Sequence, residues 1–124
     1  MNFPAEWPQP CPPTDAGSPD GEFYRVVKVD PPSPDDFLSY REMGKAENAD
    51  ACIRAGISLF RELQDAEHYS AKYQYLGNMI AVGVLDATHG LVKPTPRRMA
   101  GRLLSHHTWW PYENMPRHDL FSIC

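Results

Sequence analysis

The stretch Ser105-His106-His107-Thr108-Trp109-Trp110-Pro111 places two imidazoles and two indoles within seven residues. Its β-branched and aromatic residues predict an extended segment from His106 to Trp110, which Pro111 ends because proline has no N–H for a sheet. Neighbouring side chains of a strand point to opposite faces. One tryptophan should therefore enter the core and the other lie outside. The segment is either the floor of a polar site or the seal over a small core.

Length and composition indicate one soluble globular domain. The chain has 124 residues, of which 42% are hydrophobic and 23% charged, and that length suffices for one modest core. A net charge of −4 makes nucleic-acid binding unlikely, because such binding depends on neutralising phosphates. No apolar run is long enough to cross a membrane. The N-terminus has neither a basic start nor an apolar run, so we expect a cytoplasmic location.

The three cysteines and five histidines do not form a recognisable framework. Cys11, Cys52 and Cys124 are odd in number and far apart, which favours free thiols, with Cys52 in the core and the other two at the surface. Adjacent histidines on a strand face opposite ways, and no helical histidine pair is present, so no metal site is expected.

Proline divides the chain into two parts. Nine of the thirteen prolines lie between Pro4 and Pro34, and proline disfavours both helices and central strands. We therefore predict an extended or disordered proline-rich arm over residues 1–21, which Phe3 and Trp7 could attach to the body. A single α+β domain is predicted over residues 22–124.

Within that domain the hydrophobic pattern predicts helices and a mostly antiparallel sheet. Ser33 followed by Pro34 is typical of a helix start. The apolar run Met79–Leu85 indicates a central strand buried on both faces. Residues 91–93 could return as its hairpin partner, and residues 94–104 should form a mobile basic loop. The remaining expected elements are strands at 22–29, 57–60 and 120–123 and helices at 34–43, 49–55 and 61–73.

Arg25 is the most informative single residue of the first strand. Alternation places it on the same face as Phe23 and Val27, among apolar side chains. A buried guanidinium requires a carboxylate, phosphate or carbonyl partner. Arg25 is therefore either half of a structural ion pair with an Asp or Glu or an anion-binding arginine in a cleft.

The order of these elements resembles that of small bacterial ADP-ribosyltransferase-type domains, similar to the rifampicin-modifying and RES-toxin kinds, over residues 22–113. The resemblance implies an NAD-using toxin or effector domain, in which Arg25 holds the dinucleotide and Ser58 lines the nicotinamide pocket. It further implies Tyr24 and Trp109 as cofactor-binding residues. The late polar residue of the family would come from His106, His107 or Glu113. The sequence has no matching terminal glutamate motif.

A second hypothesis needs no catalysis. The chain could be an interaction, immunity or accessory protein that uses a surface of Trp, Tyr and Pro side chains. An outward-facing Trp109 or Trp110 would then allow a homodimer through that strand. An enzyme instead requires Arg25, Ser58 and one of His106 and His107 to converge on one open cavity.

Overall fold

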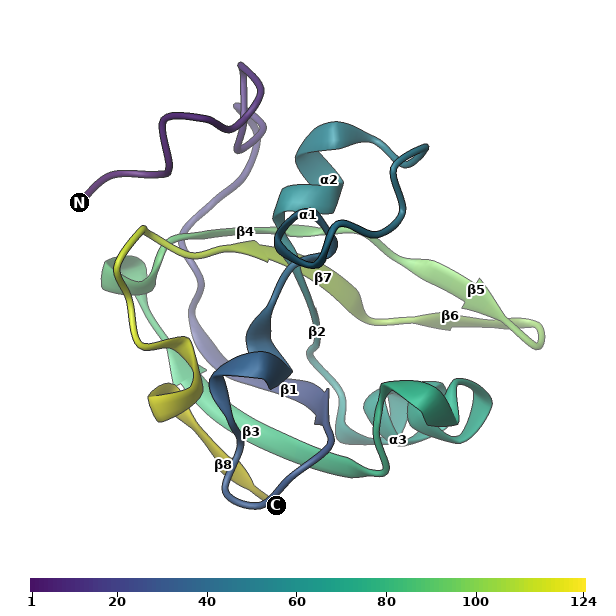
Figure 1. Ribbon diagram of the computed structural model, residues 1–124. Coiled ribbons are helices and arrows are strands. Elements are labelled where there is room, and N and C mark those ends of the chain that lie inside the picture. Colours follow the sequence, from purple (N-terminus) through teal and green to yellow (C-terminus); the bar gives the residue numbers. More distant parts are fainter.

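One antiparallel sheet of six strands organises the computed structural model, which describes residues 1–124. The strand order is β4-β7-β2-β1-β3-β8, and Figure 1 shows the sheet with its helices. Its strands are β1 (Gly21–Val27), β2 (Ile57–Phe60), β3 (Met79–Leu85), β4 (Leu91–Pro94), β7 (His106–Trp110) and β8 (Phe121–Ile123). A hairpin of β5 (Arg97–Met99) and β6 (Arg102–Leu104) forms a second sheet. The predicted α+β class with a mostly antiparallel sheet is confirmed.

The helices are short and lie at the ends of the strands. α3 packs against β1, β2 and β3, while α1 and α2 pack against each other. The α-helices are α1 (Tyr40–Met43), α2 (Ala51–Ala55) and α3 (Leu63–Lys72). The 3-10 helices are η1 (Pro34–Phe37), η2 (Gln74–Leu76), η3 (Ala87–His89) and η4 (Arg117–Leu120). No helix is long and apolar enough to cross a membrane.

The sheet curls around its main core. Trp109 on β7 lies 6.1 Å, centroid to centroid, from Phe121 on β8, although three strands separate β7 from β8 in the sheet order. The rings can meet only if the sheet bends toward itself, as sheet twist favours. The ten core residues between the two halves are Phe23, Val27, Phe37, Ile57, Leu59, Ala81, Leu85, Val92, Trp109 and Phe121.

β7 has buried side chains on both faces, which corrects the prediction of one outer tryptophan. Trp109 faces the main core, and Trp110 packs with Trp7, Cys11 and Ala55 in a second cluster. Both indoles are fully buried, because the N-terminal segment covers the face that carries Trp110. β7 also pairs on both sides, with β2 and β4. It therefore has no free edge for a homodimer.

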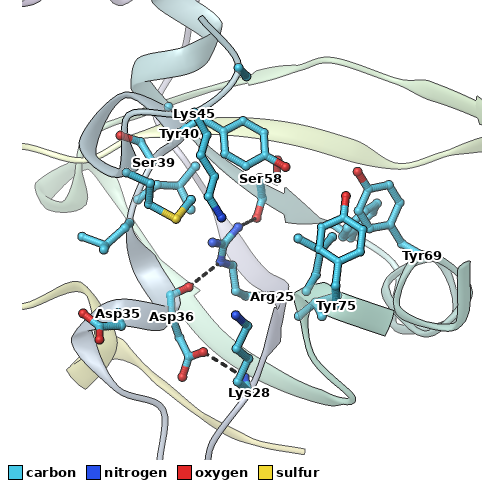
Figure 2. Close-up of a pocket in the computed structure, with 18 residues that line it drawn as sticks. Arg25, Lys28, Asp35, Asp36, Ser39, Tyr40, Lys45, Ser58, Tyr69 and Tyr75 are labelled. Carbon is cyan, nitrogen blue, oxygen red and sulfur yellow. Dashed lines mark hydrogen bonds between the residues drawn. The ribbon is translucent and has the colours of Figure 1, made fainter. Parts of the chain in front are cut away.

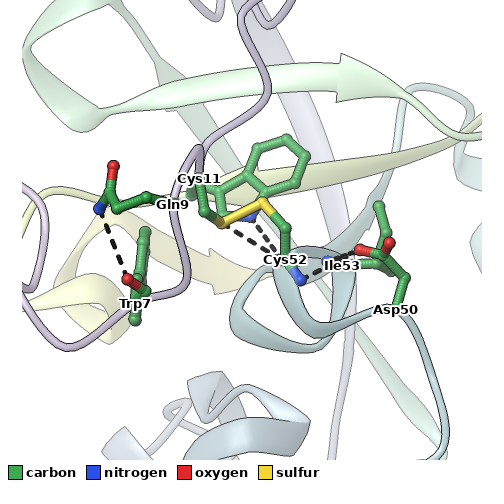
Figure 3. Close-up of a disulfide and its surroundings, with 7 residues drawn as sticks. Trp7, Gln9, Cys11, Asp50, Cys52 and Ile53 are labelled. Atoms are coloured by element: carbon green, nitrogen blue, oxygen red, sulfur yellow. Dashed lines mark hydrogen bonds between the residues drawn. A yellow bond between two sulfur atoms is a disulfide. The ribbon is translucent and has the colours of Figure 1, made fainter.

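The N-terminal segment is attached to the body at several points. A disulfide joins Cys11 to Cys52, with the two Cα atoms 5.5 Å apart, and Figure 3 shows it beside Trp7. The prediction of three free thiols was wrong, because distance along the chain does not report proximity in space. Cys11 is buried rather than at the surface, and only Cys124 is free. Further along, Gly17 exchanges two backbone hydrogen bonds with Val92 at the edge of β4.

Three features of the structure differ from the prediction. β3 is not buried on both faces: its side chains alternate between buried and partly or fully exposed, and Val84 is 64% exposed. β4 pairs with β7 and not with β3 as a hairpin. Residues 97–104 form the β5–β6 hairpin instead of a mobile loop, with Ala100 and Gly101 in left-handed conformation at its turn. Such a turn matches the twist of a hairpin.

The predicted helix over residues 34–43 is broken near its middle. Leu38 is extended, and Ser39 begins a new helix by accepting a hydrogen bond from the backbone N–H of Glu42. The carboxylate of Glu42 accepts in return from the backbone N–H of Ser39. This reciprocal cap competes with continuation of the first helix. The break separates η1 from α1, and both then contribute to one cavity.

Candidate functional site

A cavity of about 590 Å³ lies between β1, β2, η1, α1, α3 and η2. This volume is in the range of small-molecule sites, roughly 300–1,000 Å³. Figure 2 shows the cavity with Arg25 near its centre. The polar and aromatic side chains that line it are those of Arg25, Lys28, Asp35, Asp36, Ser39, Tyr40, Lys45, Ser58, Phe60, Tyr69 and Tyr75.

Arg25 enters the cavity because β1 and β2 part beside it. These strands are paired at one position only, Tyr24 opposite Phe60. Next to this pair, the Arg25 guanidinium bonds to backbone carbonyls. Its Nη1 donates to the Ser58 carbonyl at 2.9 Å, and its Nε donates to the Asp36 carbonyl at 3.0 Å. The guanidinium carbon also lies 5.7 Å from the ring centre of Phe37. The partners are thus carbonyls, and the expected structural pair with an Asp or Glu is not formed.

The third nitrogen of Arg25 remains available. Nη2 makes no hydrogen bond, yet it is not among the buried unpaired atoms of the protein, so it is open to the cavity. Burial lowers the pKa of Arg25 to about 10. The side chain is therefore still cationic at neutral pH, and its hydrogen-bond partners are neutral carbonyls.

Positive charge predominates around Arg25. Lys28 and Lys45 line the same cavity and belong to none of the ion pairs of the structure. The Asp36 carboxylate already accepts from the backbone N–H groups of Lys28, at 2.8 Å, and Ser33, at 3.0 Å. Asp35 is exposed at the edge. Three cations against two carboxylates leave one excess positive charge in the lining, which favours an anionic ligand.

Hydroxyl groups supply the remaining polarity. The hydroxyls of Tyr40, Tyr69 and Tyr75 and the Ser58 Oγ make no hydrogen bond within the protein, although their residues line the cavity. Burial raises the pKa of Tyr69, so its hydroxyl stays protonated and can donate. Such groups can bind a polar ligand without losing an existing partner.

His106 is sealed off from this cavity. It is 2% exposed on β7 and its ring lies 5.3 Å from that of Phe60. Its Nδ1 is 2.8 Å from Thr95 Oγ1 and 3.0 Å from the Thr95 carbonyl, while Nε2 has no partner. Burial, assisted by the positive charge of Arg97, lowers the pKa of His106 to about 3. The imidazole is therefore neutral.

The other predicted residues also lie elsewhere. His107 points away from His106 and lines a hollow of about 360 Å³ with Asp15, Asp20 and Arg61. Trp109 is in the main core, where its Nε1 donates to the His89 carbonyl at 2.9 Å. Tyr24 packs against the cluster that contains Phe60. Glu113 does not line the cavity either, so of the seven candidate site residues the structure brings only Arg25 and Ser58 to it.

Sequence reasoning missed the lysines and tyrosines of the cavity. Tyr40 lies in the predicted helix over residues 34–43, which gave no reason to assign it to a site, and Tyr75 and Lys45 lie in segments without a periodic pattern. The only available signal was the high frequency of tyrosine between residues 69 and 75. No group of three or more His, Cys, Asp or Glu side chains is arranged to hold a metal ion.

Comparison with known proteins does not extend these observations. No protein-family model, no curated protein and no solved structure matches the chain.

Proposed function

We propose that this protein binds an anionic small molecule in the cavity around Arg25, with NAD and related nucleotides as the first candidates. The observation that carries the proposal is the Arg25 guanidinium, which is fixed by two carbonyls and presents a free Nη2 to a cavity that Lys28 and Lys45 also line. A charged donor fixed before the ligand arrives loses little freedom on binding.

Of the transferase hypothesis we keep cofactor binding and not catalysis. Arg25 and Ser58 line the same cavity, which supports a dinucleotide site of the kind that the family resemblance implies. His106 and His107 line no part of that cavity, so no general base or acid is assigned to them. The proposed activity is binding, and catalysis by a toxin or effector is not included.

The interaction hypothesis has less support. Its surface of Trp, Tyr and Pro side chains would need exposed indoles, and all three tryptophans are buried. The large apolar side chains that are exposed are Met1, Val29, Met43, Leu63, Tyr75, Val84 and Leu103. They come from separate elements of the chain, and single exposed apolar residues are common on monomeric proteins.

The test is calorimetry of the full chain with NAD and with inorganic pyrophosphate. Arg25→Met keeps the length of the side chain but removes the charge, and it should abolish binding. Arg61→Met is the matched control, because Arg61 also donates to two carbonyls but lies outside the cavity. Binding that survives in Arg25→Met, or no binding of either anion to the native chain, would refute the proposal. If Arg25→Met does not fold, Lys45→Met replaces it and should weaken binding.

The compartment is a separate question. A cytoplasmic location was predicted from the N-terminal sequence, whereas the Cys11–Cys52 disulfide favours an oxidising compartment, since cytosolic thiols are kept reduced. Alkylation of the protein in its native source, followed by mass spectrometry, would discriminate the two. Modification of Cys124 alone would favour the oxidising compartment, and modification of all three cysteines would favour the cytoplasm.

A further inference from the structure

We infer that the ligand of this cavity joins one anionic group to a flat ring through a hydroxyl-bearing linker, which is the chemistry of a nucleoside monophosphate. The inference rests on the proposed function and adds the shape and orientation of the ligand. The anionic group lies at Arg25, and the ring lies against Tyr75.

The anionic end is at Arg25 Nη2. The guanidinium cannot turn away, because Nε and Nη1 are both held by carbonyl oxygens. Figure 2 shows Lys45 reaching toward the same guanidinium. A phosphate oxygen could accept from Nη2 while the lysine balances its remaining charge. Asp36 does not compete for this place, since its carboxylate is occupied by backbone N–H groups.

The ring end is at Tyr75. This side chain is 71% exposed although it lines the cavity, so one face of its ring is free for a ligand. Its aromatic neighbour is Tyr73, whose ring it meets edge-on with the two centroids 6.2 Å apart. An exposed aromatic face is the platform on which nucleobases stack.

Hydroxyl groups line the same cavity. Ser58 offers a free Oγ beside the carbonyl that holds Arg25, and Tyr40 and Tyr69 offer unpaired hydroxyls. In Figure 2, Tyr69 and Tyr75 lie on one side of Arg25, whereas Asp35 and Asp36 lie on the other. A ribose would present its own hydroxyls to these groups. The cavity therefore offers the three kinds of group that a nucleotide requires: cations for its phosphate, hydroxyls for its ribose and an exposed aromatic ring for its base.

The experiment compares three probes on the full native chain by calorimetry: adenosine monophosphate, ribose 5-phosphate, which lacks the ring, and adenosine, which lacks the anion. Adenosine monophosphate should bind tightest. Loss of the ring should weaken binding about tenfold, the lower part of the range for stacking on an aromatic side chain.

Variants of Tyr75 test whether the ring of the ligand stacks on this side chain. Tyr75→Ala should weaken binding of adenosine monophosphate about tenfold and leave ribose 5-phosphate unchanged, and Tyr75→Phe should keep the native affinity. Tyr112→Ala is the matched control and should leave binding unchanged, because Tyr112 packs against Phe3 and does not line the cavity. Tyr75 is largely exposed, so its replacement should not disturb folding.

Each contrary result has one meaning. Equal binding of ribose 5-phosphate and adenosine monophosphate would mean that the ring does not contribute to binding. This result would overturn the inference, while the anion-binding function would stand. A fourth probe, 4-hydroxybenzoate, has an anionic group and a ring but no ribose; equal binding of this probe and adenosine monophosphate would also overturn the inference, because no ribose would then be needed. If none of the probes, NAD or pyrophosphate binds, the proposed function itself fails.

Discussion

Two basic side chains are withdrawn from bulk water on either side of one aromatic wall, and they behave in opposite ways. Phe60 and Tyr69 line the cavity that contains Arg25, and the same two rings contact His106 from behind. Arg25 keeps its charge, with a pKa of about 10, whereas His106 is neutral, with a pKa of about 3. Burial alone therefore does not distinguish a binding group from a structural one.

The difference lies in what remains free on each side chain. Arg25 has two nitrogens held by carbonyls and a third that faces open space. His106 has one nitrogen held by Thr95 and another that is buried without any partner. A free donor that opens to a cavity can be satisfied by a ligand, but a sealed polar atom such as His106 Nε2 can only be a cost to stability. This distinction favours Arg25 as the functional residue of the pair.

The largest expected effect on stability comes from removing the ring of Phe60, which separates Arg25 from His106. Phe60→Ala should lower the free energy of unfolding by about 3–5 kcal/mol, because Phe60 is 1% exposed and its loss leaves a void. The void would connect the cavity with His106, so water should reach the imidazole and raise its pKa toward the ordinary value. Urea denaturation measures the first effect, and an NMR titration of the histidines measures the second.

Leu59→Ala is the control for the wall. Leu59 is the neighbouring residue of β2, equally buried, but it faces the main core. It should cost a similar amount of stability, about 2–5 kcal/mol, without changing the pKa of His106. If both variants raise that pKa alike, general loosening of the fold is the cause, and Phe60 does not act as a partition.

The sequence predicted those parts of the fold that depend on local alternation. Strands at 57–60, 79–85 and 106–110 follow from runs of β-branched and aromatic residues, and alternation in β1 correctly put Arg25 among apolar side chains. Helix ends were less predictable, since the Ser33 cap and the Ser39–Glu42 cap compete over the same few residues. The sequence does not indicate which of the two caps is stronger.

The cavity itself could not be predicted, because it depends on long-range geometry. Its position is set by the parting of β1 and β2 after Tyr24, which no residue pattern encodes. The Cys11–Cys52 bond depends in the same way on how the N-terminal segment folds back over α2. Tyr75 and Lys45 matter only once η2 and the α1–α2 connection meet at the cavity.

The smaller effect is in the pH dependence of stability. The folded pKa of His106 is about 3 against 6.5 for an ordinary histidine, so between these values the unfolded chain binds a proton that the folded chain does not. Stability from this group is complete above pH 6.5 and falls by roughly 1.4 kcal/mol for each pH unit of acidification below it. Urea denaturation at pH 7, 6, 5 and 4 measures the slope.

His106→Asn isolates the contribution of the imidazole. Asparagine can place an amide near Nδ1 and keep a hydrogen bond to Thr95, but it does not titrate, so its stability should vary less than that of the native chain between pH 7 and 4. Arg25→Met should leave the slope unchanged over the same interval, because the guanidinium stays protonated in both states. Equal slopes in the native chain and in His106→Asn would mean that water already reaches His106. His106 and Arg25 would then both be accessible to water, and only the hydrogen bonds of Arg25 would still distinguish it as the ligand-binding residue.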